Sequence, residues 1–167
     1  MDLSRFHSLD IVLVCGLPGA GKSYFSKKFF ADSGRKRINR KEIRRLLYEM
    51  MMFGEKWKEE YFNEHDEFLV KHVERKILEH LLQNKNRVLL DNSSVTSSSR
   101  KIYSTIARQL NRSIGVIFLN ASLKKCLERN RSREDFIPEV VVTNLSLTIE
   151  LPKREEGFKE ILILGDE

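Results

Sequence analysis

The chain has 167 residues, of which 41% are hydrophobic and 32% charged, a composition typical of one globular domain with an apolar core. No apolar run approaches the length of a membrane span, and the first residues lack a signal-peptide pattern, so we expect a cytoplasmic protein that does not bind membranes. Thirty Lys and Arg against 24 Asp and Glu give a net charge of +6, which favours an anionic partner. Nucleic acid is the natural candidate, and a nucleotide alone is the alternative.

The first predicted element is a strand over residues 10–15, which follows a short polar lead-in at residues 1–9. Residues 16–23 then read Gly-Leu-Pro-Gly-Ala-Gly-Lys-Ser and match the phosphate-loop pattern G-x-x-x-x-G-K-[ST] at every specified position. A helix is expected from Ser23 to Phe30, and its apolar face consists of Tyr24, Phe25, Phe29 and Phe30.

A glycine-rich turn between a strand and a helix lets backbone N–H groups point at an anion, and the helix N-terminus adds partial positive charge. Gly19 and Gly21 allow positive φ angles and the close approach of a phosphate. We expect Lys22 to reach the β- and γ-phosphates of ATP and Ser23 to hold Mg²⁺. The residues expected to bind ATP are therefore Gly16, Leu17, Pro18, Gly19, Ala20, Gly21, Lys22, Ser23 and Tyr24.

A basic connector at 35–37 leads to a very short strand and a second helix. Asn39, with Glu42 three residues later, predicts a helix that begins at Arg40. Arg40 and Arg44 share one face of this helix, and such a basic face is either solvated or directed at phosphates. The helix is expected to break at 50–54. The methionines and the phenylalanine of this segment are predicted to belong to the core, and a soft lip around a substrate is the alternative.

A long amphipathic pattern predicts a helix over 55–82, and its three histidines are too far apart to share one metal ion. The expected apolar stripe consists of Trp57, Tyr61, Phe62, Phe68, Leu69, His72, Val73, Ile77, Leu78, Leu81 and Leu82. The next strand, 87–91, ends in Asp91, where a parallel sheet would bring an acid beside the phosphate loop and its magnesium. The alternative is an ordinary aspartate that caps a turn.

Helices at 100–110, 121–129 and 138–151 alternate with strands at 114–119 and 161–164. In a helix, Arg129 and Arg133 would point the same way. Cys15 and Cys126 are expected to be packed thiols rather than a disulfide or a metal site. The alternation predicts an α/β fold with a central five-stranded parallel sheet flanked by helices, in a single domain over 1–167. With the phosphate loop at the end of its first strand, this arrangement resembles a P-loop NTPase of the kinase type.

Together these motifs resemble the small P-loop kinases that include phage-type polynucleotide 5′-kinase and the L-seryl-tRNA(Sec) kinases. Residues 16–23 resemble both families, and 38–44 resemble the polynucleotide-kinase segment that carries a catalytic Asp and an Arg for the substrate phosphate. The order and spacing of 91–107, 118–123, 129–133, 137–138 and 150–152 are similar to the seryl-tRNA kinases. The resemblance covers nearly the whole chain.

The resemblance implies roles for several residues. Arg129 and Arg133 match lid arginines that contact ATP phosphates in the transition state, and Arg44 matches the arginine that positions the acceptor. The resemblance places the magnesium-binding position at Asp91 or at the next residue, Asn92. Lys41 stands at the catalytic Asp, and a protonated lysine cannot accept a proton. Either Glu42 replaces that base and pairs with Arg45, or the base lies elsewhere.

The sequence therefore predicts a kinase that uses ATP and Mg²⁺ and transfers the γ-phosphate to a hydroxyl of a nucleic acid, foremost a 5′-hydroxyl end. One alternative is a kinase of seryl-tRNA or of a small-molecule hydroxyl. Another is an ATP-binding switch or RNA-binding module with weak ATPase activity, which Lys41 would allow. The acceptor, the preference for ATP over GTP and the oligomeric state stay open.

Overall fold

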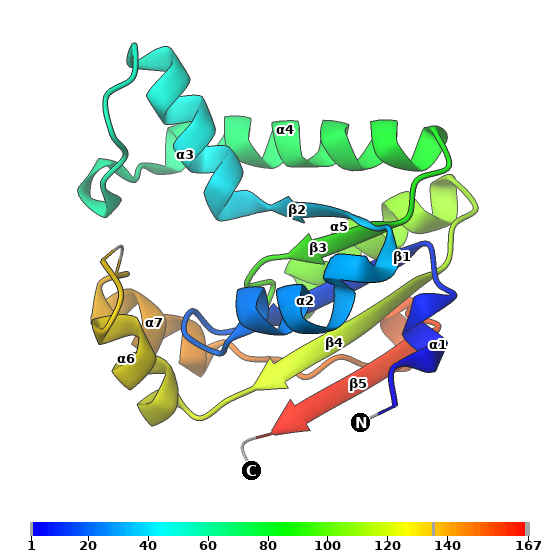
Figure 1. The fold of residues 1–167 in the computed structure, drawn as a ribbon. Coiled ribbons are helices and arrows are strands. Elements are labelled where there is room, and N and C mark those ends of the chain that lie inside the picture. Colours follow the sequence, from blue (N-terminus) through cyan, green and yellow to red (C-terminus); the bar gives the residue numbers. More distant parts are fainter. Residues whose placement is uncertain (1, 135, 166–167) are drawn as a thin grey trace.

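The computed structural model describes residues 2–134 and 136–165, in which five parallel strands lie between two layers of helices (Figure 1). The sheet has the order β2-β3-β1-β4-β5. Its strands are β1 (Ile11–Gly16), β2 (Lys36–Asn39), β3 (Val88–Asp91), β4 (Ile114–Asn120) and β5 (Glu160–Gly165). The predicted fold is confirmed, and the carboxyl ends of all strands lie at one edge of the sheet.

Seven α-helices occur in the described residues, and they cover both faces of the sheet (Figure 1). They are α1 (Ser4–His7), α2 (Lys22–Phe30), α3 (Arg40–Met51), α4 (Glu64–Gln83), α5 (Ser97–Gln109), α6 (Leu123–Arg131) and α7 (Glu139–Leu147). None of the helices in this part of the chain is both long and apolar enough to cross a membrane.

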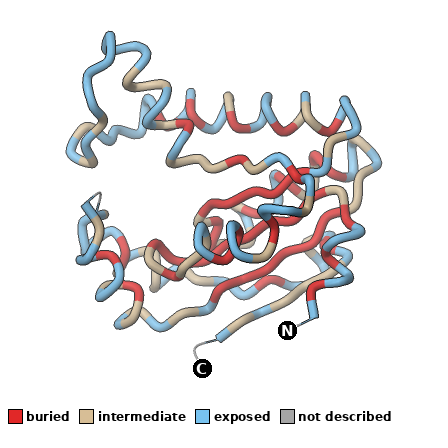
Figure 2. The backbone as a smooth tube through the Cα atoms, in the orientation of Figure 1, coloured by how far each residue is buried: buried red, intermediate tan, exposed pale blue. Residues whose placement is uncertain are grey.

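The central strand β1 is buried on both sides because its side chains alternate between two cores. Ile11, Leu13 and Cys15 pack into a core with residues of α4 and α5. Val12 and Val14 pack into a second core with residues of α1, α2, α6 and α7. Figure 2 shows the buried strands between helices whose outer faces are exposed. Cys15 and Cys126 are buried thiols that do not form a disulfide in the described residues, as expected.

The prediction of a polar lead-in at residues 1–9 is wrong for the described residues of this segment. Leu3, Phe6 and Leu9 are buried in the second core, and residues 4–7 form α1. Arg35 holds this segment, because its guanidinium donates hydrogen bonds to the carbonyl oxygens of Phe6, His7 and Leu9. The polar residues among 1–9 obscured the helical turn and its three buried apolar side chains in the sequence pattern.

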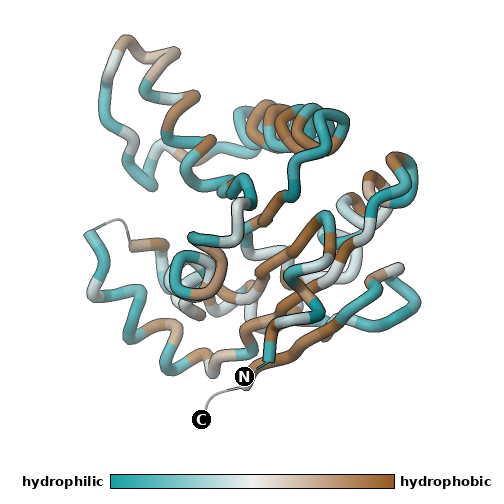
Figure 3. Tube along the Cα trace, turned by 45° about the vertical axis from the view of Figure 1, so that its right-hand side comes forward, coloured by the Kyte–Doolittle hydropathy of each residue, from teal (hydrophilic) through white to brown (hydrophobic). Residues whose placement is uncertain are grey.

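The prediction of a helix over 55–82 is wrong in its first part. The helix α4 begins at Glu64 because the Asn63 side chain caps its N-terminus, and residues 55–63 hold only a 3₁₀ turn, η2 (Glu59–Tyr61). Figure 3 shows alternating hydropathy along α4, but the buried positions include Glu67 and Glu74. Phe68, Leu69, His72 and Ile77 of the predicted stripe are exposed.

The prediction that residues 50–54 belong to the core is also wrong. Met50, Met51, Met52 and Phe53 are exposed at the end of α3, where Figure 2 shows a pale blue tip. Tyr24 is likewise 70% exposed rather than part of an apolar face. Near the C-terminus α7 ends at Leu147 rather than at Leu151.

Candidate active site

The phosphate loop connects β1 to α2 and takes a backbone path that needs glycine. The φ angles are +144° at Gly16, +85° at Gly19 and +94° at Gly21, all in a region that L side chains disfavour. A Cβ on Gly19 would lie 2.3 Å from the carbonyl oxygen of Cys126 in α6. Gly19 therefore also lets α6 pack against the loop, a reason that the sequence motif alone does not reveal. No side chain caps the N-terminus of α2, which leaves it available to an anion.

Lys22, the first residue of α2, folds back over the loop. Its Nζ donates to the carbonyl oxygens of Gly16 at 3.0 Å and Leu17 at 2.8 Å. Burial lowers the pKa of the Lys22 ammonium to about 8, and Asp91 opposes the shift. The Lys22 ammonium is poorly solvated and contacts neutral carbonyl groups here. A negatively charged phosphate in their place would stabilise its charge more strongly.

Ser23 and Asp91 meet at the carboxyl edge of the sheet. The Ser23 Oγ donates to Oδ2 of Asp91 at 2.9 Å, and Arg37 donates to the same oxygen through Nε at 3.0 Å and Nη2 at 2.7 Å. The Oδ1 atom of Asp91 is buried and has no hydrogen-bond partner among the described residues. A serine hydroxyl beside a carboxylate with one unused oxygen fits Mg²⁺, which prefers oxygen ligands.

A cavity of about 550 Å³, here called the central cavity, opens in front of the loop. The loop and α2 contribute Pro18, Lys22 and Ser23, and the end of β3 contributes Asp91 to Ser93. The remaining wall comes from the β2–α3 region, the segment before α4, α4 itself and the region of α7. Its charged lining residues are Lys22, Arg40, Lys41, Arg44, Lys71 and Arg133, with Glu59, Glu67 and Asp91. Cations outnumber carboxylates, as polyphosphate binding requires.

Three residues of α3 that the sequence singled out lie in different surroundings. Arg44 lines the central cavity and donates to both carboxylate oxygens of Glu67, at 2.8 and 2.9 Å. Lys41 also lines it, with Nζ 3.2 Å from Oε1 of Glu59. Glu42 is not among the lining residues, and its carboxylate accepts from Arg37 rather than from Arg45.

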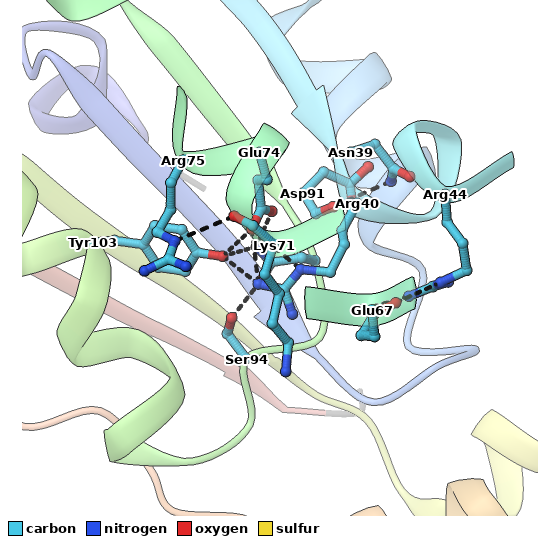
Figure 4. A network of polar contacts seen from close by, with 11 residues as sticks. Asn39, Arg40, Arg44, Glu67, Lys71, Glu74, Arg75, Asp91, Ser94 and Tyr103 are labelled. Carbon is cyan, nitrogen blue, oxygen red and sulfur yellow. Dashed lines mark hydrogen bonds and ion pairs between the residues drawn. The ribbon is translucent and has the colours of Figure 1, made fainter. Parts of the chain in front are cut away.

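A buried polar network supports the wall formed by α3 and α4 (Figure 4). Glu74 is 1% exposed and accepts hydrogen bonds from Arg40, the Tyr103 hydroxyl and Asn92. Tyr103 accepts in turn from Arg40 at 2.6 Å and Asn92 at 2.7 Å. Burial raises the pKa of Tyr103, so the phenol keeps its proton. Because the Glu74 carboxylate accepts four hydrogen bonds, two of them from Arg40, the network fixes Asn92 directly after Asp91.

Arg129 and Arg133, which the resemblance assigns to a lid, approach the loop from the α6–α7 region. Nη1 of Arg129 lies 3.5 Å from the carbonyl oxygen of Gly19, and Arg133 lines the central cavity. The two arginines do not share a helix, because α6 ends at Arg131, so the helical spacing considered for them does not apply. The structure nevertheless brings both side chains around the loop.

Sequence reasoning missed three residues of this site. Arg37 belongs to the predicted basic connector at 35–37, but in the structure it lies on β2 and contacts Asp91 of the neighbouring strand β3. Glu59 and Glu67 fall within the predicted helix over 55–82, where the predicted apolar stripe does not distinguish them from its other charged residues. The available signal was an acidic residue at a core-facing position of the helix, as at Glu67 and Glu74. Such a residue is seldom buried without a charged or hydrogen-bonding partner, so it indicates that a partner lies nearby.

The sheet, the loop and the helix that follows it give the chain the fold of the P-loop kinases. A family model described as an AAA domain matches residues 11–148. Because this match spans most of the sequence, the chain belongs to that family.

Two curated relatives and one solved structure illustrate the likeness. L-seryl-tRNA(Sec) kinase of Methanococcus maripaludis is 29% identical over 145 residues, which cover 85% of this chain and 53% of the relative. Heterogeneous nuclear ribonucleoprotein U-like protein 2 of Homo sapiens is 25% identical over 157 residues, 91% of this chain and 21% of the relative. The chain therefore spans about half of the first relative and about a fifth of the second. Chaetomium thermophilum Kti12 in complex with ADP-AlF3 superposes with a TM-score of 0.69 at 18% identity, over 93% of this chain and 88% of that one.

Proposed function

We propose that the protein is a phosphotransferase that uses ATP and Mg²⁺ and transfers the γ-phosphate to a hydroxyl of a nucleic acid, foremost a 5′-hydroxyl end. The observation that carries the proposal is the central cavity. Its lining joins the phosphate loop, the Ser23–Asp91 pair and Arg44 within one space of about 550 Å³. A donor phosphate and an acceptor hydroxyl need such a shared space.

In the proposed mechanism, the loop from Gly16 to Tyr24 and the Lys22 ammonium hold the phosphates of ATP. Lys22 exchanges the carbonyl oxygens of Gly16 and Leu17 for phosphate oxygens. Ser23 and Asp91 hold Mg²⁺, which neutralises phosphate charge when bound.

Arg129 and Arg133 would stabilise the charge of the transferred phosphoryl group, and Arg44 would orient the acceptor. The pairing of Arg44 with Glu67 fixes the guanidinium in one orientation at the cavity wall. A base contributes less than positioning and charge in a loose phosphoryl-transfer step. The sequence predicts Glu42 as the base, but we favour Glu59, because Glu59 lines the central cavity beside Lys41 and Glu42 is not among the lining residues.

The relative from Methanococcus maripaludis supports an acceptor that contains RNA, since its name is that of an L-seryl-tRNA(Sec) kinase. The positive charge of the chain supports a polyanionic acceptor as well. A nucleic-acid acceptor predicts that the KM for the acceptor rises steeply with salt concentration, whereas a small-molecule acceptor predicts little dependence.

The test is transfer of labelled γ-phosphate from ATP to a pool of oligonucleotides with 5′-hydroxyl ends. The same pool with 5′-phosphate ends and the Lys22→Ala variant are the controls. We expect label only on the hydroxyl ends and only with the unmodified protein. If ATP binds but no end is labelled, the 5′-end proposal fails, and seryl-tRNA and small-molecule alcohols become the next acceptors to test.

The second candidate function is a nucleotide-dependent RNA-binding module. The ion pair of Lys41 with Glu59 favours it, because it places a cation where kinases of the resembled type have a catalytic carboxylate. The ribonucleoprotein relative points the same way. Such a module would hydrolyse ATP slowly and at a rate that no acceptor changes.

A further inference from the structure

A second cavity, here called the outer cavity, lies beyond the central cavity and has a volume of about 830 Å³. The two cavities share Glu59, Arg133 and Pro138 as lining residues, so they adjoin. One wall comes from the segment between α3 and α4, and the other comes from the segment between α6 and α7. Figure 1 shows these segments facing each other at the end of the molecule where the phosphate loop lies.

The charge of the outer cavity differs from that of the central cavity. Its lining has as many cations as carboxylates, namely Arg45, Lys58 and Arg133 with Glu59, Glu60 and Glu134. A balanced set of donors and acceptors suits an uncharged polar group rather than a phosphate. The excess of cations stays in the central cavity, where the phosphates would bind.

Aromatic side chains stand on both walls of the outer cavity. Trp57 belongs to the α3–α4 segment, and Phe136, which is 57% exposed, belongs to the α6–α7 segment. Bases of single-stranded nucleic acids bind by stacking on such rings, and this recognition tolerates every base. Hydrogen-bonding groups of both kinds surround the two rings.

Trp57 is held in place by its neighbours. Its ring meets the Tyr48 ring edge-on at 5.2 Å between centroids, and Tyr48 stacks on Tyr61 at 5.1 Å. A ring that is already ordered loses little conformational freedom when a base stacks on it. The aromatic cluster therefore acts as a support for the wall of the outer cavity.

We infer that the outer cavity binds the terminal nucleoside of the acceptor strand, with its base between Trp57 and Phe136, while the terminal hydroxyl reaches into the central cavity. The inference rests on the proposed function, because it names the part of the acceptor that this cavity takes. The acceptor is thus a nucleic-acid end with a base on its last nucleotide. An alcohol without a base would lack this contact.

Trp57 allows a binding test that does not depend on catalysis, since it is the single tryptophan of the chain. The probe is a short 5′-hydroxyl oligonucleotide, compared with the same oligonucleotide whose 5′-terminal residue is abasic. We expect quenching of Trp57 fluorescence by the first probe and about tenfold weaker binding of the second. Phe136→Ala should remove this difference, whereas Phe68→Ala, at an exposed phenylalanine of α4, should preserve it.

Three outcomes of this binding test separate the inference about the outer cavity from the proposed function. Quenching that needs the terminal base supports the inference, and if labelled phosphate is not transferred, only the proposed function fails. Equal quenching by the normal and abasic probes overturns the inference, even if transfer occurs. Quenching by ATP alone that competes with the oligonucleotide assigns the cavity to the donor base and also overturns it.

Discussion

The contact between Ser23 and Asp91 joins two residues that lie 68 positions apart in the sequence. Ser23 was predicted from the phosphate-loop motif and Asp91 from the end of its strand, and parallel pairing of β1 with β3 brings the loop and that strand end together. Asp91 also balances the charge of Arg37, so its Oδ2 atom is engaged while Oδ1 stays unused. The proposed metal site therefore depends on the Asp91 carboxylate, whose Oδ1 atom is left for a metal ion.

Replacing this pair should remove the metal-dependent part of the activity. We expect Ser23→Ala and Asp91→Asn each to lower kcat for phosphate transfer about a hundredfold, because each removes an oxygen ligand of Mg²⁺. The measurement is the rate of labelled transfer as a function of Mg²⁺ concentration. Ser26→Ala is the matched control, since Ser26 is a buried serine of the same helix that does not line the central cavity. Equal losses in all three variants would contradict the assignment.

A comparison of two glutamates tests the base. Glu59 lines the central cavity, whereas Glu42 pairs with Arg37 outside its lining. We expect Glu59→Gln to slow transfer about a hundredfold and Glu42→Gln to change it less than about threefold. Steady-state kcat of the two variants decides the point. A large effect of Glu42→Gln alone would restore the base that the sequence predicts.

At the scale of elements, Arg35 connects α1 to the sheet. Its guanidinium donates to five backbone carbonyl oxygens, those of Phe6, His7, Leu9, Asp10 and Val88. A short helix that makes few internal hydrogen bonds depends on such external contacts. The amino-terminal segment is therefore held by one buried cation as well as by its apolar residues.

Removing this cation should destabilise the fold. We expect Arg35→Met to lower the free energy of unfolding by about 3 kcal/mol, because it leaves several buried carbonyl oxygens without a donor. Lys36→Met, at an exposed neighbouring position, should change it by less than about 0.5 kcal/mol. Urea denaturation followed by circular dichroism measures both. Similar midpoints for the two variants would show that the hydrogen bonds to Arg35 contribute little.

The packing of α6 against the phosphate loop gives a further prediction. Gly19→Ala would force a Cβ within 2.3 Å of the Cys126 carbonyl oxygen, so we expect ATP affinity to fall at least about tenfold. Gly54→Ala has a similar φ angle, +94°, but no atom within 4 Å of the added Cβ, and it should leave ATP affinity unchanged. Calorimetric titration with ATP compares them. Unchanged affinity in both would mean that α6 yields to the extra methyl group.

Local features of the sequence predicted the parts of the site that the chain encodes within a few residues. The phosphate loop follows from eight consecutive residues, and the start of α3 follows from Asn39, whose side chain accepts from the Glu42 N–H as expected. Asp91 could be placed at the carboxyl edge of the sheet because it is the last residue of a predicted parallel strand.

Features that depend on distant partners could not be predicted in this way. Arg37 pairs with Asp91 only because β2 lies beside β3. The exposure of Met50 to Phe53 depends on where the end of α3 lies relative to the sheet, which hydropathy does not encode. The segment over 55–63 has apolar residues at helical spacing, but its aromatic rings pack on Tyr48 instead of continuing α4.

For the whole molecule, the sheet places the phosphate loop and the region of α6 and α7 at one end (Figure 1). Arg129, Arg133 and the two adjoining cavities belong to this end. The segment before α4 and the α6–α7 region form opposite walls, so donor and acceptor would enter between them. This arrangement suits a reaction between two bound substrates. It gives less reason for hydrolysis by water alone, which needs no second cavity.

The most direct test of the central claim is ATP turnover measured with and without a 5′-hydroxyl oligonucleotide, together with the phosphate gained by that oligonucleotide. We predict that the acceptor raises turnover at least about tenfold and gains one phosphate for each ATP consumed, and that Lys22→Ala abolishes both effects. Turnover that the acceptor leaves unchanged, with no phosphate gained, would contradict the account and support a nucleotide-dependent RNA-binding module.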